Sequence, residues 1–169
     1  MIKSLSAAAL SIALGACAGT ASRPVPDSPR SAPDATSSPA AVPIAAPGEI
    51  MVGLARSMIG QPYRYGGAAP SGFDCSGLVV YAAGGAGVRV PRTAHEQLKA
   101  GRAVARRAVR AGDLVFMHLA GKDLHVGIAL DADHFVHAPS KGGYVRIDSL
   151  GAPPYAKGFV AARRVIATR

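Results

Sequence analysis

The segment FDCSGLV, residues 73–79, decides the fold because it marks the passage from a loop to a helix. Residues 61–73 are rich in Gly and Pro, which is typical of loops. Asp74 is a residue type that caps helix N-termini, and the apolar residues after it predict a helix from Cys75 to about Ala83, ended by Gly84-Gly85. The sequence therefore predicts a cysteine in the first turn of a helix.

Helical patterns come first along the chain, and strand patterns come later. Ile50, Leu54 and Met58 follow helical spacing as far as Gly60, and Thr93–Glu96 is a capping box that predicts a helix to about Ala100. Five short apolar runs bounded by turn residues then predict strands at 113–117, 125–130, 134–137, 144–147 and 159–166. This order predicts an α+β fold in which helices pack on one face of a roughly five-stranded antiparallel sheet.

Length and composition favour one globular domain with tails. The 169 residues are 49% hydrophobic and 17% charged, so the chain can form a packed core. The formal net charge of +9 favours an anionic partner. The 2 cysteines cannot form a disulfide framework or a four-thiolate zinc site, and no cofactor is expected.

The first residues have the pattern of an export signal. Lys3 precedes a short apolar run at 5–14, which is far below the roughly 20 residues of a membrane-spanning helix. Leu14-Gly15-Ala16-Cys17 resembles a lipobox, the motif at which a bacterial lipoprotein is acylated and cleaved. We therefore expect a signal peptide at 1–16 and lipidation of Cys17 by fatty acyl chains such as palmitate, which would anchor the chain in a membrane. An ordinary signal peptide with a chance cysteine is the alternative.

A tether is expected to separate this anchor from the globular part. Ala18 follows the cysteine where an inner-membrane retention signal would place Asp, so we expect the periplasmic face of the outer membrane. Residues 17–48 are rich in Pro, Ala and Ser without apolar periodicity, which predicts a disordered, extended tether. Residues 49–169 form the predicted globular domain, which carries 16 Lys and Arg against 8 Asp and Glu.

Cys75 is the candidate nucleophile. At a helix N-terminus, unpaired backbone N–H groups and the helix dipole lower the pKa of a thiol from about 8.5, and a neighbouring imidazolium lowers it further. The same N–H groups can stabilise an oxyanion. A buried structural cysteine is the alternative explanation of this residue.

His125 and His137 are the candidate partners of the cysteine. Residues 131–133 form the turn of a predicted hairpin, so the two histidines are expected as near-opposite or diagonal neighbours. A cysteine nucleophile needs a base to take its proton and a third group to orient that base. A zinc site of two histidines and a carboxylate is a weaker alternative, and no metal is expected. His118 is expected at the surface.

Six motifs, in order, resemble the NlpC-type cell-wall endopeptidases, a family of papain-like cysteine peptidases. The motifs are PYRYGG at 62–67, FDCSGLV at 73–79, PRTA at 91–94, GDLVF at 112–116, HVGI at 125–128 and FVHA at 135–138. The similarity extends over about residues 50–166, with a less regular stretch at 117–124. It implies a compact papain-like fold.

The resemblance also implies a role for individual residues. Cys75 matches the nucleophile, His125 the general base and His137 the residue that orients the base. Tyr63 matches a residue whose hydroxyl joins the Cys75 amide in stabilising the oxyanion. The implied reaction is hydrolysis of peptidoglycan stem peptides between D-γ-glutamate and the diamino acid at the third position.

Three further residues are implied as substrate-binding. Asp74 and Ser76 match positions that line the substrate cleft, and Arg92 matches a position with a structural or substrate-side role. The expected partners are therefore peptidoglycan and, through the lipid anchor, a membrane, with the protein acting as a monomer.

Other functions remain open from the sequence. The same triad could serve an amidase or acyltransferase on another acyl substrate, and a non-catalytic wall-binding lipoprotein is a third possibility. The densest basic stretch could bind anionic wall polymer or lipid headgroups, or could be a solvated face; it comprises Lys99, Arg102, Arg106, Arg107 and Arg110. It lacks interleaved aromatic residues, so no nucleic-acid partner is expected.

Overall fold

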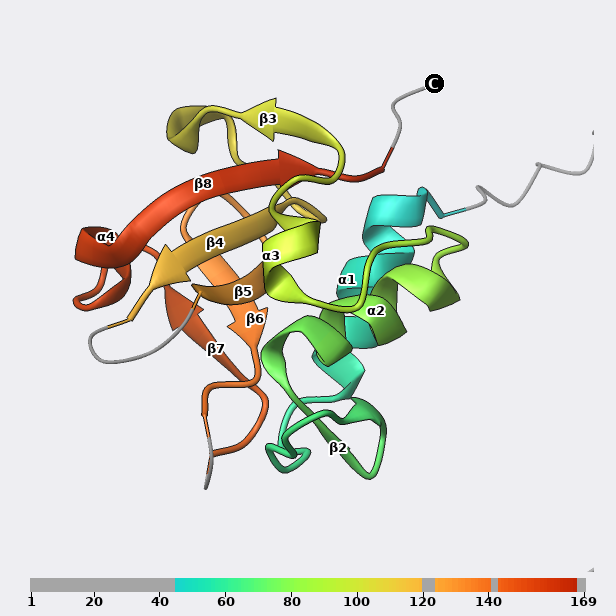
Figure 1. The fold of residues 1–169 in the computed structure, drawn as a ribbon. Coiled ribbons are helices and arrows are strands. Elements are labelled where there is room, and N and C mark those ends of the chain that lie inside the picture. The colour runs from blue at the N-terminus through green and yellow to red at the C-terminus, as the bar shows by residue number, and fades with distance from the viewer. Residues whose placement is uncertain (1–44, 120–123, 141–142, 167–169) are drawn as a thin grey trace, which may run out of the picture. The chain divides into compact units, whose positions relative to one another are not determined.

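Three helices, α1 to α3, precede the six-stranded antiparallel sheet in the computed structural model, which describes residues 45–119, 124–140 and 143–166. The helices are α1 (Pro47–Ser57), α2 (Cys75–Gly85), α3 (Ala94–Gln97), the 3₁₀ turn η1 (Arg106–Ala108) and α4 (Tyr155–Gly158). The strands of the main sheet are β3 (Arg102–Val104), β4 (Leu114–His118), β5 (Leu124–Ala129), β6 (His134–His137), β7 (Arg146–Ser149) and β8 (Phe159–Arg164). Their order across the sheet is β3-β8-β4-β5-β6-β7 (Figure 1).

The predicted α+β class is confirmed, but several boundaries differ. The main sheet has six strands rather than about five, because β3 was not predicted; its three residues, two of them exposed, give no apolar alternation. A separate two-stranded pair joins β1 (Ala68–Ala69) to β2 (Gly72–Phe73) within the Gly-rich loop. The fourth predicted strand lies two residues later, and α3 ends at Gln97 rather than near Ala100.

The first turn of α2 forms where the sequence predicted it. Asp74 has extended backbone angles, and its carboxylate accepts a hydrogen bond from the Gly77 N–H at 2.6 Å, so it is the N-cap. A Cβ atom on Gly77 would collide with the carbonyl oxygen of Gly67, so the helix start packs directly on the loop backbone. The sequence thereby fixes Cys75 at the junction of helix and loop.

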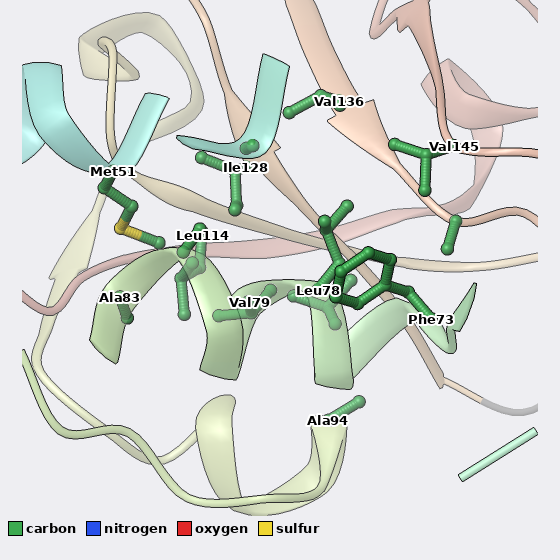
Figure 2. Packing of buried hydrophobic residues seen from close by; sticks show 14 of the residues in the cluster. Met51, Phe73, Leu78, Val79, Ala83, Ala94, Leu114, Ile128, Val136 and Val145 are labelled. Carbon is green, nitrogen blue, oxygen red and sulfur yellow. The ribbon is translucent and has the colours of Figure 1, made fainter. Parts of the chain in front are cut away.

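Apolar packing holds α2 against the sheet. Leu78, Val79 and Ala83 are fully buried and lie in one cluster with Met51 of α1 and Ile128 of β5 (Figure 2). Burying a Leu, Val, Ile or Met side chain stabilises the fold by about 1.5–3 kcal/mol. The helix that carries Cys75 is therefore a rigid support for that residue.

Helices α1, α2 and α3 pack on one face of the sheet, as predicted, and the other face is covered as well. Along β4, Leu114 and Phe116 belong to the cluster under α1 and α2, whereas Val115 and Met117 belong to a second cluster. That second cluster includes Tyr155 of α4, which lies away from the other helices in Figure 1. Because β4 is buried on both faces, its sequence LVFM is continuously apolar rather than alternating.

No helix in the described residues combines the length and the apolar character required to cross a lipid bilayer.

Candidate active site

The thiol of Cys75 lies where the N-terminus of α2 meets β5. Its sulfur is within hydrogen-bonding reach of the backbone N–H groups of Val126, Ser76 and Cys75 itself. Val126 follows His125 directly in β5, so this contact places the thiol against the residue that carries the candidate base. The structure thus brings the predicted nucleophile to the predicted base from segments 50 positions apart.

The pKa of the Cys75 thiol is raised above its ordinary value, which corrects the predicted decrease. Burial is the main cause, and the carboxylate of Asp74 adds to it. The three backbone N–H groups lower the pKa but do not compensate for the loss of water. A thiol of this kind is protonated at neutral pH and depends on a base for its activation.

His125 and His137 are diagonal neighbours in the hairpin, as predicted. The β5–β6 ladder pairs Ile128 with Val136, so its continuation places Gly127 opposite His137. His125 Nε2 lies 2.7 Å from His137 Nδ1, and the rings meet edge to face at a centroid distance of 4.9 Å. Both rings are buried, with exposed fractions of 8% and 0%. The two imidazoles are therefore directly hydrogen-bonded.

A carboxylate that the sequence analysis missed extends this pair. Asp148 Oδ2 lies 2.8 Å from His137 Nε2, and it also accepts hydrogen bonds from Arg146 Nε at 2.9 Å and from the Tyr155 hydroxyl at 2.6 Å. Asp148 is in β7, which was predicted to end at Ile147. Extending this strand in the sequence analysis would have placed Arg146 and Asp148 on one face, but only the pairing of β6 with β7 brings that face to His137.

Electrostatics keep His137 neutral and Asp148 ionised. Burial lowers the pKa of His137 to about 4, although Asp148 pulls it upward. Burial raises the pKa of Asp148, but hydrogen bonds from Tyr155, Arg146 and His137 outweigh it and hold that pKa below the ordinary value. At neutral pH, the cluster therefore consists of an anionic carboxylate and an uncharged imidazole.

Tyr63 lies beside the thiol. Its backbone N–H donates to the Gly143 carbonyl at 2.8 Å, and the residue bridges Phe73 immediately before the N-cap. Burial raises the pKa of the Tyr63 phenol, and the charges of Cys75 and Asp74 raise it further. The hydroxyl is therefore protonated at neutral pH and is available as a hydrogen-bond donor.

Asp74, Ser76 and Arg92 form one connected polar cluster around the start of α2. Arg92 Nη1 lies 3.0 Å from both Asp74 Oδ1 and Ser76 Oγ, and its Nη2 lies 2.7 Å from Asp74 Oδ2. Asp74 Oδ2 also accepts a hydrogen bond from the Gly66 N–H at 3.0 Å. Because a bidentate arginine holds the carboxylate in place, the residues on both sides of the nucleophile have fixed positions.

The remaining candidates lie elsewhere or outside the described residues. Cys17 and the predicted signal peptide are not in the described part of the chain, and neither is most of the predicted tether. His118 is exposed, as expected. Within the basic stretch, Arg106 is half-buried, donates to the Ala132 carbonyl at 2.7 Å and lies over the Phe159 ring. The other four basic residues of this stretch are exposed.

The described residues contain no group of three or more His, Cys, Asp or Glu side chains arranged to hold a metal ion. Instead, the facing nitrogens of the two histidines bind each other.

Comparison with known families agrees with this geometry. Residues 60–164, which include every polar residue of the site described above, match the NlpC/P60 family. The chain belongs to this family. The predicted papain-like α+β fold is also confirmed by a solved NlpC/P60 family protein from Bacillus cereus, with a TM-score of 0.67 and 27% identity over 71% of this chain and 40% of that one.

Two curated NlpC/P60 relatives have named activities. Murein DD-endopeptidase MepH of Escherichia coli is 40% identical over 114 residues, which are 64% of this chain and 42% of the relative. Gamma-D-glutamyl-L-lysine dipeptidyl-peptidase of Bacillus subtilis is 37% identical over 109 residues, which are 63% of this chain and 37% of the relative. The chain thus spans less than half the length of either protein.

Proposed function

We propose that this protein is a cysteine endopeptidase that hydrolyses peptidoglycan stem peptides. The observation that carries the proposal is the position of Cys75, at the N-terminus of α2 and against Val126, which follows His125 directly. Behind His125, His137 and Asp148 continue a chain of hydrogen bonds at 2.7 and 2.8 Å. Nucleophile, base and orienting group are thus in the order that covalent catalysis requires.

The proposed mechanism uses the polar groups in sequence. His125 takes the proton of Cys75, and the thiolate attacks the carbonyl carbon of the scissile amide. The backbone N–H of Cys75 and the Tyr63 hydroxyl donate to the developing oxyanion. His125 then gives the proton to the leaving amine, and water attacks the thioester with His125 again acting as base. His137 orients His125 throughout.

We place the scissile bond between D-γ-glutamate and diaminopimelate in the stem peptide. The dipeptidyl-peptidase relative carries a γ-D-glutamyl bond in its name, which supports this specificity. The name of MepH supports a second candidate, cleavage of the D,D cross-link between stems. Asp74, Ser76 and Arg92 are the proposed substrate-binding residues, because Asp74 and Ser76 flank the nucleophile at the start of α2 and Arg92 is hydrogen-bonded to both.

Purified muropeptides distinguish these bonds. The full chain is incubated separately with monomeric tetrapeptides and with cross-linked dimers, and the products are identified by mass spectrometry beside a Cys75→Ser control. Release of fragments cut after D-glutamate supports the first specificity, and conversion of dimers to intact monomers supports the second. If neither substrate is cut while the thiol still reacts with iodoacetamide, the peptidase proposal is wrong. An added amine acceptor then tests for acyl transfer.

We also propose that Cys17 anchors the protein by lipidation to the periplasmic face of the outer membrane. The support is the LGAC motif at 14–17, which follows a short apolar run, and the Ala at position 18. Expression of the full chain and of Cys17→Ser with radiolabelled palmitate, followed by membrane fractionation, tests the anchor. Label and membrane association that persist in the Cys17→Ser variant would contradict it.

A further inference from the structure

The hydrogen-bond chain from Asp148 to His125 has one consistent arrangement of protons. Asp148 Oδ2 receives hydrogen bonds from Arg146 Nε and the Tyr155 hydroxyl, so it is an ionised acceptor with no proton to donate. The His137 nitrogen that faces it, Nε2 at 2.8 Å, must therefore carry a hydrogen.

The protonated Nε2 of His137 determines the state of its other nitrogen. His137 is fully buried, and three groups that carry or can gain charge approach its ring, namely Asp148 of β7, Tyr155 of α4 and His125 of β5; Arg146 of β7 acts from behind Asp148. A buried imidazole beside a single carboxylate that Arg146 already neutralises is uncharged, so Nδ1 of His137 is an acceptor.

Because Nδ1 of His137 is an acceptor, Nε2 of His125, at 2.7 Å, must be the donor. A neutral His125 with a hydrogen on Nε2 has its lone pair on Nδ1, which is the ring nitrogen closer to the main chain. The backbone N–H of Val126, the residue that follows His125, contacts the Cys75 sulfur. Because Nε2 of His125 is hydrogen-bonded to His137, Nδ1 is the ring nitrogen that acts as the base for the thiol.

We propose that Asp148 is a positioning residue that selects the reactive tautomer of His125 through His137. Asp148 does not touch the reacting atoms; it acts at a distance of two hydrogen bonds. Removing it frees His137 to adopt the opposite tautomer, which donates from Nδ1 to His125 Nε2 and leaves His125 with its hydrogen on Nδ1, where it cannot accept the thiol proton.

Nitrogen-15 NMR of the full chain tests the tautomers directly. Histidine ring nitrogens with and without a hydrogen have distinct chemical shifts. Variants in which one histidine at a time is replaced assign the signals. We expect Nε2 to be protonated and Nδ1 to be unprotonated in both His125 and His137 at neutral pH. A hydrogen on Nδ1 of His125 in the unmodified protein would overturn the proposal, even if no Asp148 variant folds.

Two Asp148 variants add a kinetic readout. Asp148→Ala and Asp148→Asn are expected to convert part of His125 to the other tautomer and to slow iodoacetamide alkylation of Cys75 by about 10-fold to about 10⁴-fold. The upper value is the loss of kcat that a wrong histidine tautomer causes in a Ser-His-Asp triad. Asp131→Asn is the matched control, because Asp131 Oδ2 also lies beside a histidine, at 3.1 Å from the exposed His134. That pair does not belong to the hydrogen bonds that link Asp148 to His125. Unchanged tautomers and alkylation in both Asp148 variants would contradict the proposal.

Loss of muropeptide hydrolysis in the same variants would extend the inference to catalysis, and that readout alone rests on the proposed function. If the unmodified protein cuts no muropeptide, the NMR and alkylation results still decide the role of Asp148. The two proposals can therefore fail independently.

Discussion

His125 Nε2 lies 2.7 Å from His137 Nδ1 even though the sheet register places Gly127, not His125, opposite His137. The contact is diagonal, and it crosses a position without a side chain. A Cβ atom on Gly127 would lie 3.2 Å from the His137 Cβ and 2.5 Å from the Phe135 ring. The absence of a side chain at 127 is therefore part of what lets the two imidazoles meet.

Gly127→Ala is expected to reduce the activity and the alkylation rate of Cys75 by about tenfold or more, because the added methyl group displaces His137. The methyl group also overpacks Phe135, which should lower the free energy of unfolding by about 1–3 kcal/mol. Gly84→Ala is the matched control, since Gly84 is helical and has no atom within 4 Å of its added Cβ. The free energy of unfolding of Gly84→Ala should rise by about 0.5–1 kcal/mol, and its alkylation rate should be unchanged. Normal alkylation by Gly127→Ala would contradict the packing argument.

Stability is expected to fall as pH decreases from about 6.5 to about 4. His137 has a pKa of about 4 in the folded protein and near 6.5 when unfolded, so the unfolded chain binds an extra proton in this window. The loss amounts to about 3 kcal/mol by pH 4. Urea unfolding between pH 4 and 7 measures it. His137→Gln should have a flatter profile, whereas the exposed His95→Gln should behave like the unmodified protein.

Local sequence signals predicted the elements that carry the site. Asp74 as N-cap and the start of α2 depend on neighbouring residues, and both agree with the structure. The diagonal placement of His125 and His137 needed only the turn at 131–133. Such short-range patterns fix where a helix begins and which strand residues are neighbours.

Long-range contacts could not be predicted from these signals. Asp148 reaches His137 through the pairing of β6 with β7, and nothing in the residues between them fixes the register. The predicted direction of the Cys75 pKa shift is wrong for a similar reason. Backbone N–H groups at a helix start are visible in the sequence, whereas burial of the thiol against β5 is a property of the packed structure.

Asp74→Ala is expected to destabilise the protein by about 1–3 kcal/mol, because it removes the N-cap of α2 and the carboxylate partner of Arg92. At a pH high enough to ionise the thiol in both proteins, where loss of the Asp74 charge no longer speeds the reaction, Asp74→Ala should also slow alkylation, since the first turn that holds Cys75 loses its link to Gly66. Glu49→Ala is a control that removes a capping carboxylate from α1 instead. Chemical denaturation and alkylation rates measure both effects, and equal alkylation in the two variants would contradict this role of Asp74.

The alkylation rate of Cys75 is expected to rise with pH and to continue rising above pH 8.5, the ordinary pKa of a cysteine, because burial and the Asp74 carboxylate raise the pKa of this thiol. Asp74→Asn removes the second of these causes and keeps a side chain that can cap α2, so its profile should shift to lower pH. Iodoacetamide kinetics from pH 5 to 10 measure both profiles. A rate that is already constant below pH 7 would show a preformed thiolate–imidazolium pair, and His125 would then not need to remove a proton from Cys75 before attack.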